Sequence, residues 1–155
     1  MSDEDSLPKV RFATFCKMVL LSQQTGKDLS LIGIMSHLNL HIEGWGDMPN
    51  SVEFVLQELS LFAALDAPKK KEDVTITTDL KSELLRARLE PVDQVVSFSQ
   101  PQFDETGTLT TRLDGLRLQV PTKNGKYTIE AKWSVGPKVI GRLTLPLTVK
   151  VVEPS

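Results

Sequence analysis

Hydrophobic and polar residues alternate with a period of two along the last part of the chain. The hydrophobic side of the segment KYTIEAKWSV consists of Tyr127, Ile129, Ala131, Trp133 and Val135. After the turn sequence GPK the alternation resumes and continues to Val151. This period is typical of a β-strand with one face in the core and the other in water. The pattern therefore predicts a strand, a turn and a second strand, with Trp133 in the core. Pro146 cannot donate a ladder hydrogen bond, so a free edge or a bulge is expected there.

Shorter segments with the same alternation lie earlier in the chain, at 59–66, 74–80, 85–89 and 116–120. Sequences rich in Pro, Gly, Asp and Asn, such as APKKKED, EPVD and PTKNG, separate them and are typical of turns. Several short strands at this spacing favour an antiparallel sandwich over a βαβ fold. We therefore predict an all-β protein with an antiparallel β-sandwich.

One segment, 51–57, is compatible with two structures. Val52, Val55, Leu56 and Leu59 follow helical spacing, and Ser51 is a suitable N-cap. Apolar runs this short do not separate a helix from a strand. A short helix at 51–57 and a strand there both remain open.

The segment FCKMVLLSQQTGKDLSLIGIMSHLNL, residues 15–40, predicts a hairpin that is apolar on both faces. In its second half, Leu29 and Leu31 fall on one side and Ile32 and Ile34 on the other. Strands of this kind are usually covered on both sides. We expect the opposite sheet to cover one face. A loop, the segment 52–57 or another protein chain would cover the second.

The same N-terminal pattern resembles the opening of an uncharacterised family of small, mainly bacterial proteins. The matching motif is a strand, a turn containing TGK and then LSLIGI, where Met35 stands in place of a frequent aromatic residue. The closing segments GKYTIEAKWS and PKVIGRLTLPLTV are also similar to that family, whereas the stretch 45–109 matches only in being strand-like. The resemblance implies an immunoglobulin-like β-sandwich and a domain of unknown function, and it implies no reaction.

Composition and charge limit the classes of function. The chain has 155 residues and a formal net charge of −2, which gives no electrostatic preference for nucleic acid. We expect a flexible tail at 1–8 and a single sandwich domain at 9–153. The acidic start MSDEDSLPKV is unlike a secretory signal, and no apolar run approaches the about 20 residues that span a bilayer. A cytoplasmic protein without membrane contact is therefore predicted.

Few residues offer reactive chemistry. Cys16 is the single cysteine, which excludes an intrachain disulfide, and its apolar neighbours indicate a small buried hydrophobe. His37, His41 and Glu43 would share one face of a strand and are competent zinc ligands. Residues four apart on a strand are separated by ~13 Å, however, which is too far for both histidines to bind one ion. We expect no enzyme activity, no metal and no cofactor, and keep a metal-dependent enzyme at His37 and His41 as the least favoured alternative.

Trp45 is the strongest candidate for binding. It lies between two glycines in the predicted loop EGWGDMP, close to Met48, and a tryptophan on a surface loop is a typical anchor for a partner. The alternative is that Trp45 closes one end of the sandwich. We predict a non-enzymatic module that binds a partner protein or a second copy of itself through Trp45, Met48, Leu29 and Leu31. A small-ligand or carbohydrate site with Trp45 as stacking platform is the second hypothesis.

Overall fold

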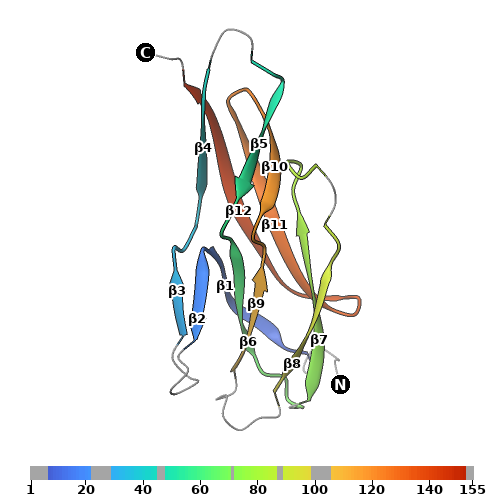
Figure 1. Ribbon diagram of the computed structural model, residues 1–155. Coiled ribbons are helices and arrows are strands. Elements are labelled where there is room, and N and C mark those ends of the chain that lie inside the picture. The colour runs from blue at the N-terminus through green and yellow to red at the C-terminus, as the bar shows by residue number, and fades with distance from the viewer. Residues whose placement is uncertain are drawn as a thin grey trace.

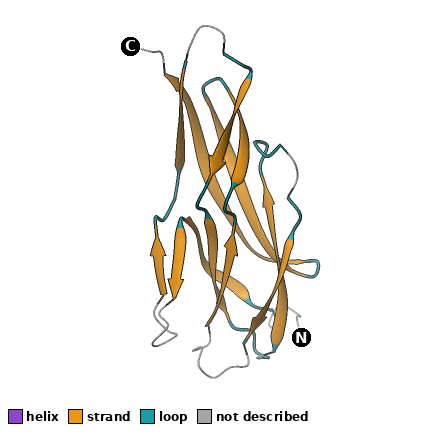
Figure 2. Cartoon of the chain, viewed as in Figure 1, coloured by secondary structure: helices purple, strands orange, loops and turns teal. Residues whose placement is uncertain are grey.

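The computed structural model describes residues 7–21, 29–44, 48–70, 72–86, 89–98 and 106–152. In these ranges the chain forms strands and no helix, which confirms the predicted all-β class (Figures 1 and 2). The strands are β1 (Lys9–Cys16), β2 (Met18–Leu21), β3 (Leu29–Ile32), β4 (Leu38–Glu43), β5 (Ser51–Leu56), β6 (Ser60–Asp66), β7 (Asp73–Lys81), β8 (Val92–Ser97), β9 (Thr106–Arg112), β10 (Leu116–Pro121), β11 (Gly125–Val135) and β12 (Lys138–Val152).

Two sheets face each other and enclose the core. The larger sheet has the order β4-β12-β11-β7-β8, and the smaller has the order β1-β6-β9. Two further pairs, β10-β5 and β2-β3, are attached to this frame (Figure 1). The ladders between the described strands are antiparallel except that β12 pairs with β4 in parallel. This arrangement agrees with the predicted sandwich, and the parallel edge strand is a feature that the alternation pattern does not contain.

The pair β5–β10 continues the pair β6–β9 beyond a kink. At the kink, the Leu113 N–H donates to the Leu59 carbonyl oxygen and the Gly115 N–H donates to the Leu56 carbonyl oxygen. The Leu59 N–H donates to Asp114 Oδ1 over 3.1 Å. The chain therefore passes from β5 to β6 and from β9 to β10 without losing its backbone partners.

The segment 51–57 is a strand, so the helical alternative is wrong for it. Ser51–Leu56 pairs with Leu116–Pro121 along its whole length, beginning at Ser51↔Pro121. A helix at this point would leave the backbone groups of β10 without their partner. Pairing with a strand more than 60 residues away decides the structure of this segment, and its own sequence does not.

The core lies between the sheets and follows the predicted alternation. The side chains of Ile129, Ala131 and Trp133 on β11 are almost completely buried, and so are those of Leu145, Leu147 and Val149 on β12. The exception is Val139 at the start of β12, which is 44% exposed and lies opposite the register shift in β11. Trp133 is 0% exposed, which confirms its predicted place in the core. At Pro146, β12 pairs only with Thr128 of β11, because the ladder to β4 starts at Leu147. The missing N–H is tolerated at this free edge, as predicted.

The described residues of the predicted strand 85–89 do not form a strand, and residues 87 and 88 lie outside the described part. Of the described positions 85, 86 and 89, only Leu85 takes part in pairing, through an isolated bridge to Leu118 of the other sheet. β7 ends at Lys81, after which the chain crosses to β10, where the Gln119 N–H donates to the Leu84 carbonyl oxygen over 2.7 Å. Leu85 and Leu89 are partly buried and pack against the core without belonging to a strand.

Candidate functional site

The β2–β3 hairpin is built as an extension of β1. The Met35 N–H donates to the Phe15 carbonyl oxygen, and the Lys17 N–H donates to the carbonyl oxygens of Ile32 and Gly33. The same register continues from Met18↔Ile32 to the end of the hairpin. Strand β1 thus pairs with β6 on one edge and, at its end, with the chain leading out of β3 on the other. The predicted hairpin forms: β2 pairs with β3. The hairpin extends past the end of β1, beyond the edge of the sheet β1-β6-β9.

Gly33 permits the bend between the hairpin and the sheet. Its φ is +68°, a left-handed conformation that costs other residues about 1–2 kcal/mol. A Cβ atom at this position would lie 2.8 Å from Lys17 Cγ. The glycine of the LSLIGI motif is therefore required for both its backbone angle and its close contact with Lys17.

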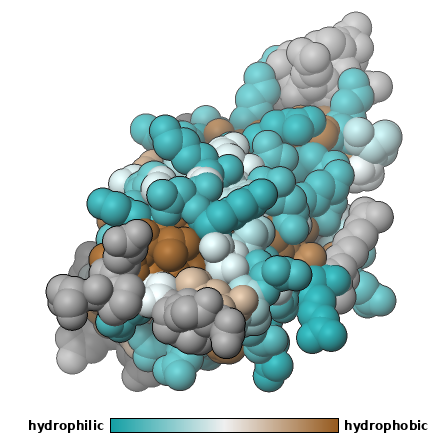
Figure 3. Space-filling model, turned by 90° about the horizontal axis from the view of Figure 1, so that it is seen from above, coloured by the Kyte–Doolittle hydropathy of each residue, from teal (hydrophilic) through white to brown (hydrophobic). Residues whose placement is uncertain are grey.

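One face of the hairpin is hydrophobic and exposed. Met18 is 41% exposed, Leu20 46%, Ile32 45% and Ile34, just beyond β3, 59%. Met18 and Ile32 are direct cross-strand neighbours, and Leu20 lies two residues from Met18 on the same face, so these three side chains form one patch, which we call the hairpin patch. The other exposed large hydrophobic residues of the described chain are spread over β1, β5, β8 and the two ends of β12. From above, most of the visible surface is hydrophilic, with hydrophobic areas between charged and polar side chains (Figure 3).

The opposite face of the hairpin is less exposed. Val19 and Leu31 are direct neighbours on this face and are half-buried. Leu29 pairs with Leu21 at the end of β3, and the orientation of its side chain is outside the described part of the structure. The sequence singled out Leu29 and Leu31, whereas the structure exposes Met18, Leu20 and Ile32. Because both faces are apolar, the pattern contained no signal that could separate them.

Cys16 lies immediately before the hairpin and is 0% exposed. It lies beside Ser60, on the side of the small sheet that also carries Thr14 and Phe62 and faces away from the core residue Phe15. This outer side is therefore partly covered, since Phe62 is only 3% exposed. Burial raises the pKa of the Cys16 thiol, and a hydrogen bond from the Met18 backbone opposes this only partly. The thiolate needed by a nucleophile is disfavoured here, which agrees with the expected structural role.

The Trp45 loop falls largely outside the described residues, which stop at Gly44 and resume at Met48. Met48 is half-buried and packs against the main core. Its side chain therefore has only part of its surface available to a partner. The hypotheses that use Trp45, whether for a protein or for a carbohydrate, stay predictions.

The histidines do not converge on one point. β4 begins at Leu38, and the ring of His37 just before it lies 3.0 Å from Thr148 Oγ1 and 3.0 Å from Asn39 Oδ1. His41 is further along the strand, beside Lys150 of β12. Within the described ranges, no three His, Cys, Asp or Glu side chains gather as they would around a metal ion. The arrangement offers no support for the metal-dependent alternative.

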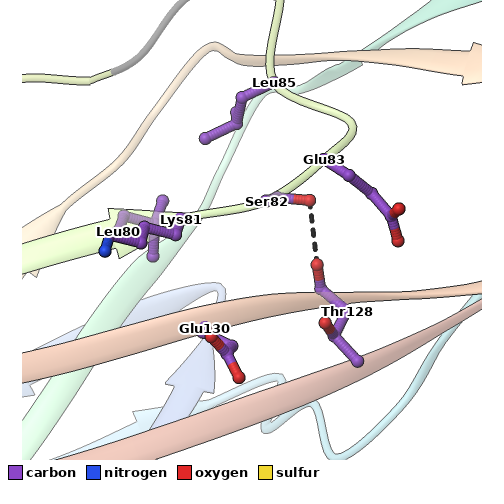
Figure 4. A pocket seen from close by; sticks show the side chains of 7 residues that line it. All are labelled: Leu80, Lys81, Ser82, Glu83, Leu85, Thr128 and Glu130. Atoms are coloured by element: carbon purple, nitrogen blue, oxygen red, sulfur yellow. Dashed lines mark hydrogen bonds between the residues drawn. The ribbon is translucent and has the colours of Figure 1, made fainter.

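A pocket of about 490 Å³ lies where β7 leaves β11 (Figure 4). Ser82 Oγ donates to the Thr128 carbonyl oxygen over 2.8 Å and accepts the Leu84 N–H. The serine hydroxyl thus fixes the start of the crossing to the other sheet. The charged side chains of the pocket, Lys81, Glu83 and Glu130, are exposed. Since Ser82 has a structural role and no histidine lines the described wall, we find no nucleophilic set here.

In comparisons with known proteins, neither a protein-family model nor a curated protein matches the chain. The part of the chain that the structure describes contains no helix with the length and apolar character needed to cross a bilayer. The candidate site therefore rests on the residues themselves, above all on the hairpin patch.

Proposed function

We propose that this protein is a non-enzymatic interaction module and that the β2–β3 hairpin binds a partner protein or a second copy of the chain. The observation that carries the proposal is the hairpin patch. Three large hydrophobic side chains of one short hairpin, those of Met18, Leu20 and Ile32, are each more than 40% exposed, and so is Ile34 just after it. Such a concentration on one element is typical of a protein-binding surface.

The backbone of the hairpin supports the same proposal. In the described part of the chain, β3 pairs only with β2, so its outer edge has unpaired N–H and C=O groups. A two-stranded hairpin is marginally stable alone, and a third strand would satisfy these groups. A protein partner can supply both an apolar surface and an added strand. A second copy can do so by pairing β3 with its own β3 across a twofold axis.

The self-association form is tested by sedimentation equilibrium. We expect wild type to dimerise and the double variant Leu20→Lys/Ile32→Lys to be monomeric, because two buried charges would oppose the interface. Val95→Lys is the matched control, since Val95 is 67% exposed on β8, away from the hairpin. Far-UV circular dichroism verifies that each variant is folded. Wild type that stays monomeric at high concentration rules out self-association.

The form with a different partner is tested by quantitative affinity capture from an extract of the source cells. Proteins recovered by wild type and by Val95→Lys, and lost with Ile32→Lys, are the expected partners. A central hydrophobic contact changed to a charge should weaken binding at least about tenfold. Equal recovery by all three proteins would remove the hairpin from the proposal. Trp45→Ala in the same experiment tests the loop.

The proposal includes a cytoplasmic location and membership of the uncharacterised family that the opening hairpin resembles. In support, the residues of the LSLIGI motif form β3 and the Gly33 bend, whereas TGK lies outside the described residues. Proteins that share the hairpin are expected to share a hydrophobic residue at the positions of Met18 and Ile32. An alignment of such proteins with polar residues at both positions would contradict a common binding surface.

A further inference from the structure

A second pocket, of about 240 Å³, opens between the two sheets. We call it the inter-sheet pocket. Its floor is formed by core residues of both sheets, including Leu61 of β6, Leu80 of β7 and Leu116 of β10. These three side chains are at most 6% exposed, so the pocket ends on the hydrophobic core.

The pocket lies beside a point where the two sheets are joined. Past this point the sheets move apart. The edge strands β8 and β9 are linked by the Gln94 amide, whose Nε2 donates to the Thr110 carbonyl oxygen and whose Oε1 accepts from Thr111 Oγ1. β8 begins only two residues before Gln94, and β9 ends at Arg112. The strands therefore stop beside this link, and the gap between the sheets stays open there.

One polar atom in the pocket has no partner. Thr78 is 4% exposed, and its Oγ1 has no hydrogen-bond partner among the described residues. Thr78 lies beside Trp133 on β11 and lines the inter-sheet pocket. A buried hydroxyl without a partner destabilises the fold, so such a group calls for an explanation. A bound molecule with a hydrogen-bonding group provides one.

The charged residues at the rim limit the chemical class of this molecule. Among the described residues that line the pocket, Arg112 is the cation, and its Nη2 lies 2.6 Å from Asp114 Oδ2. The guanidinium is thus already paired with a carboxylate, and Glu90 adds a further negative group. An anionic ligand would be repelled, whereas the apolar floor gives no counter-charge to a cation. An uncharged molecule suits the pocket best.

We propose that the inter-sheet pocket binds a small, uncharged, mainly apolar molecule whose hydroxyl or carbonyl group hydrogen-bonds with Thr78 Oγ1. The volume exceeds the about 150 Å³ of an apolar cavity that binds benzene, so it suits a molecule with one ring. An apolar floor with a few placed polar groups is typical of small-molecule sites. This site is separate from the hairpin patch and does not depend on the proposed protein partner.

The test uses two probes of similar shape, cyclohexanol and methylcyclohexane. Binding is followed by the methyl NMR shifts of Leu61, Leu80 and Leu116, and by the emission of Trp133 in a Trp45→Phe background, where it is the single tryptophan. We expect both probes to shift these methyl signals saturably. In Thr78→Val, which has nearly the same volume, cyclohexanol should bind at least about fivefold more weakly and methylcyclohexane equally well.

Two further variants keep the result interpretable. Thr75→Val changes an exposed threonine on the outer face of β7 and should leave both affinities unchanged. Leu113→Trp fills the pocket from its half-buried wall and should abolish binding of both probes. Absence of saturable shifts at the three leucines overturns the site. If Thr78→Val weakens the binding of both probes equally, the proposed role of the hydroxyl is overturned.

Discussion

At the scale of single residues, Asp114 stabilises the kink between β9 and β10. Its Oδ1 accepts the Leu59 N–H, and its Oδ2 accepts Arg112 Nε and Nη2 over 3.1 and 2.6 Å. These bonds, that from the Leu59 backbone first, hold the pKa of the Asp114 carboxyl below its ordinary value of 3.8. The folded state therefore prefers the charged form more strongly than the unfolded chain does.

This preference predicts a pH-dependent effect of Asp114→Ala. The charged Asp114 carboxylate stabilises the folded state fully above the unfolded pKa, and this stabilisation is lost as the pH falls through the lower folded pKa. We expect Asp114→Ala to lower the melting temperature at about pH 7, and the difference from wild type to shrink as the pH falls below 3.8 and through the lower folded pKa. Asp66→Ala is the control, because the ion pair of Asp66 with Arg11 is exposed and long, at 3.9 Å. A difference that stays constant with pH would contradict the role of the carboxylate.

Cys16 provides a second prediction at this scale. Because its thiol is buried and its pKa is raised, the native protein should react with Ellman's reagent far more slowly than the unfolded chain. The measurement compares the rates in buffer and in denaturant at equal pH. Reaction of the native thiol at the rate of a free exposed cysteine would show that Cys16 is accessible.

At the scale of elements, the hairpin depends on Gly33. We expect Gly33→Ala to lower the free energy of unfolding, or to loosen the hairpin locally, by at least about 1–2 kcal/mol. Gly136→Ala is the matched control, since Gly136 also has a positive φ but a Cβ atom there would meet nothing within 4 Å. Urea denaturation gives the global effect, and hydrogen exchange of β2 and β3 amides gives the local one. Equal effects of the two variants would show that contact with Lys17 adds nothing.

The elements also show which local signals are reliable. Strands β11 and β12 could be predicted because the alternation is long and their turn has a clear sequence signature. The segment 51–57 could not be assigned and Leu85 was placed in the wrong element, because both depend on partners in β10 that are distant in sequence. The hairpin itself was predictable, whereas its exposed face was not. Leucine and isoleucine on both sides give no period that distinguishes inside from outside.

At the scale of the whole molecule, the place of a leucine in the fold decides how much it contributes to stability. Leu118 of β10 is 0% exposed and belongs to the core, whereas Leu20 of the hairpin is 46% exposed. We expect Leu118→Ala to lower the free energy of unfolding by about 2–5 kcal/mol and Leu20→Ala by less than about 0.5 kcal/mol. Chemical denaturation of both variants measures this. A large effect of Leu20→Ala on the monomer would show that the hairpin patch is part of the core and is not a binding surface.

The sequence alone determined the all-β class, the closing hairpin, the core position of Trp133 and the presence of an apolar hairpin at the start. These features follow from local alternation and turn chemistry, which act over a few residues. Tertiary structure decided the rest. It paired β4 in parallel with β12, made 51–57 a strand, turned Ile32 outward and opened a pocket beside Thr78. Each of these depends on which distant strands meet, because a strand finds its hydrogen-bond partners and its covered face only in the assembled sheets.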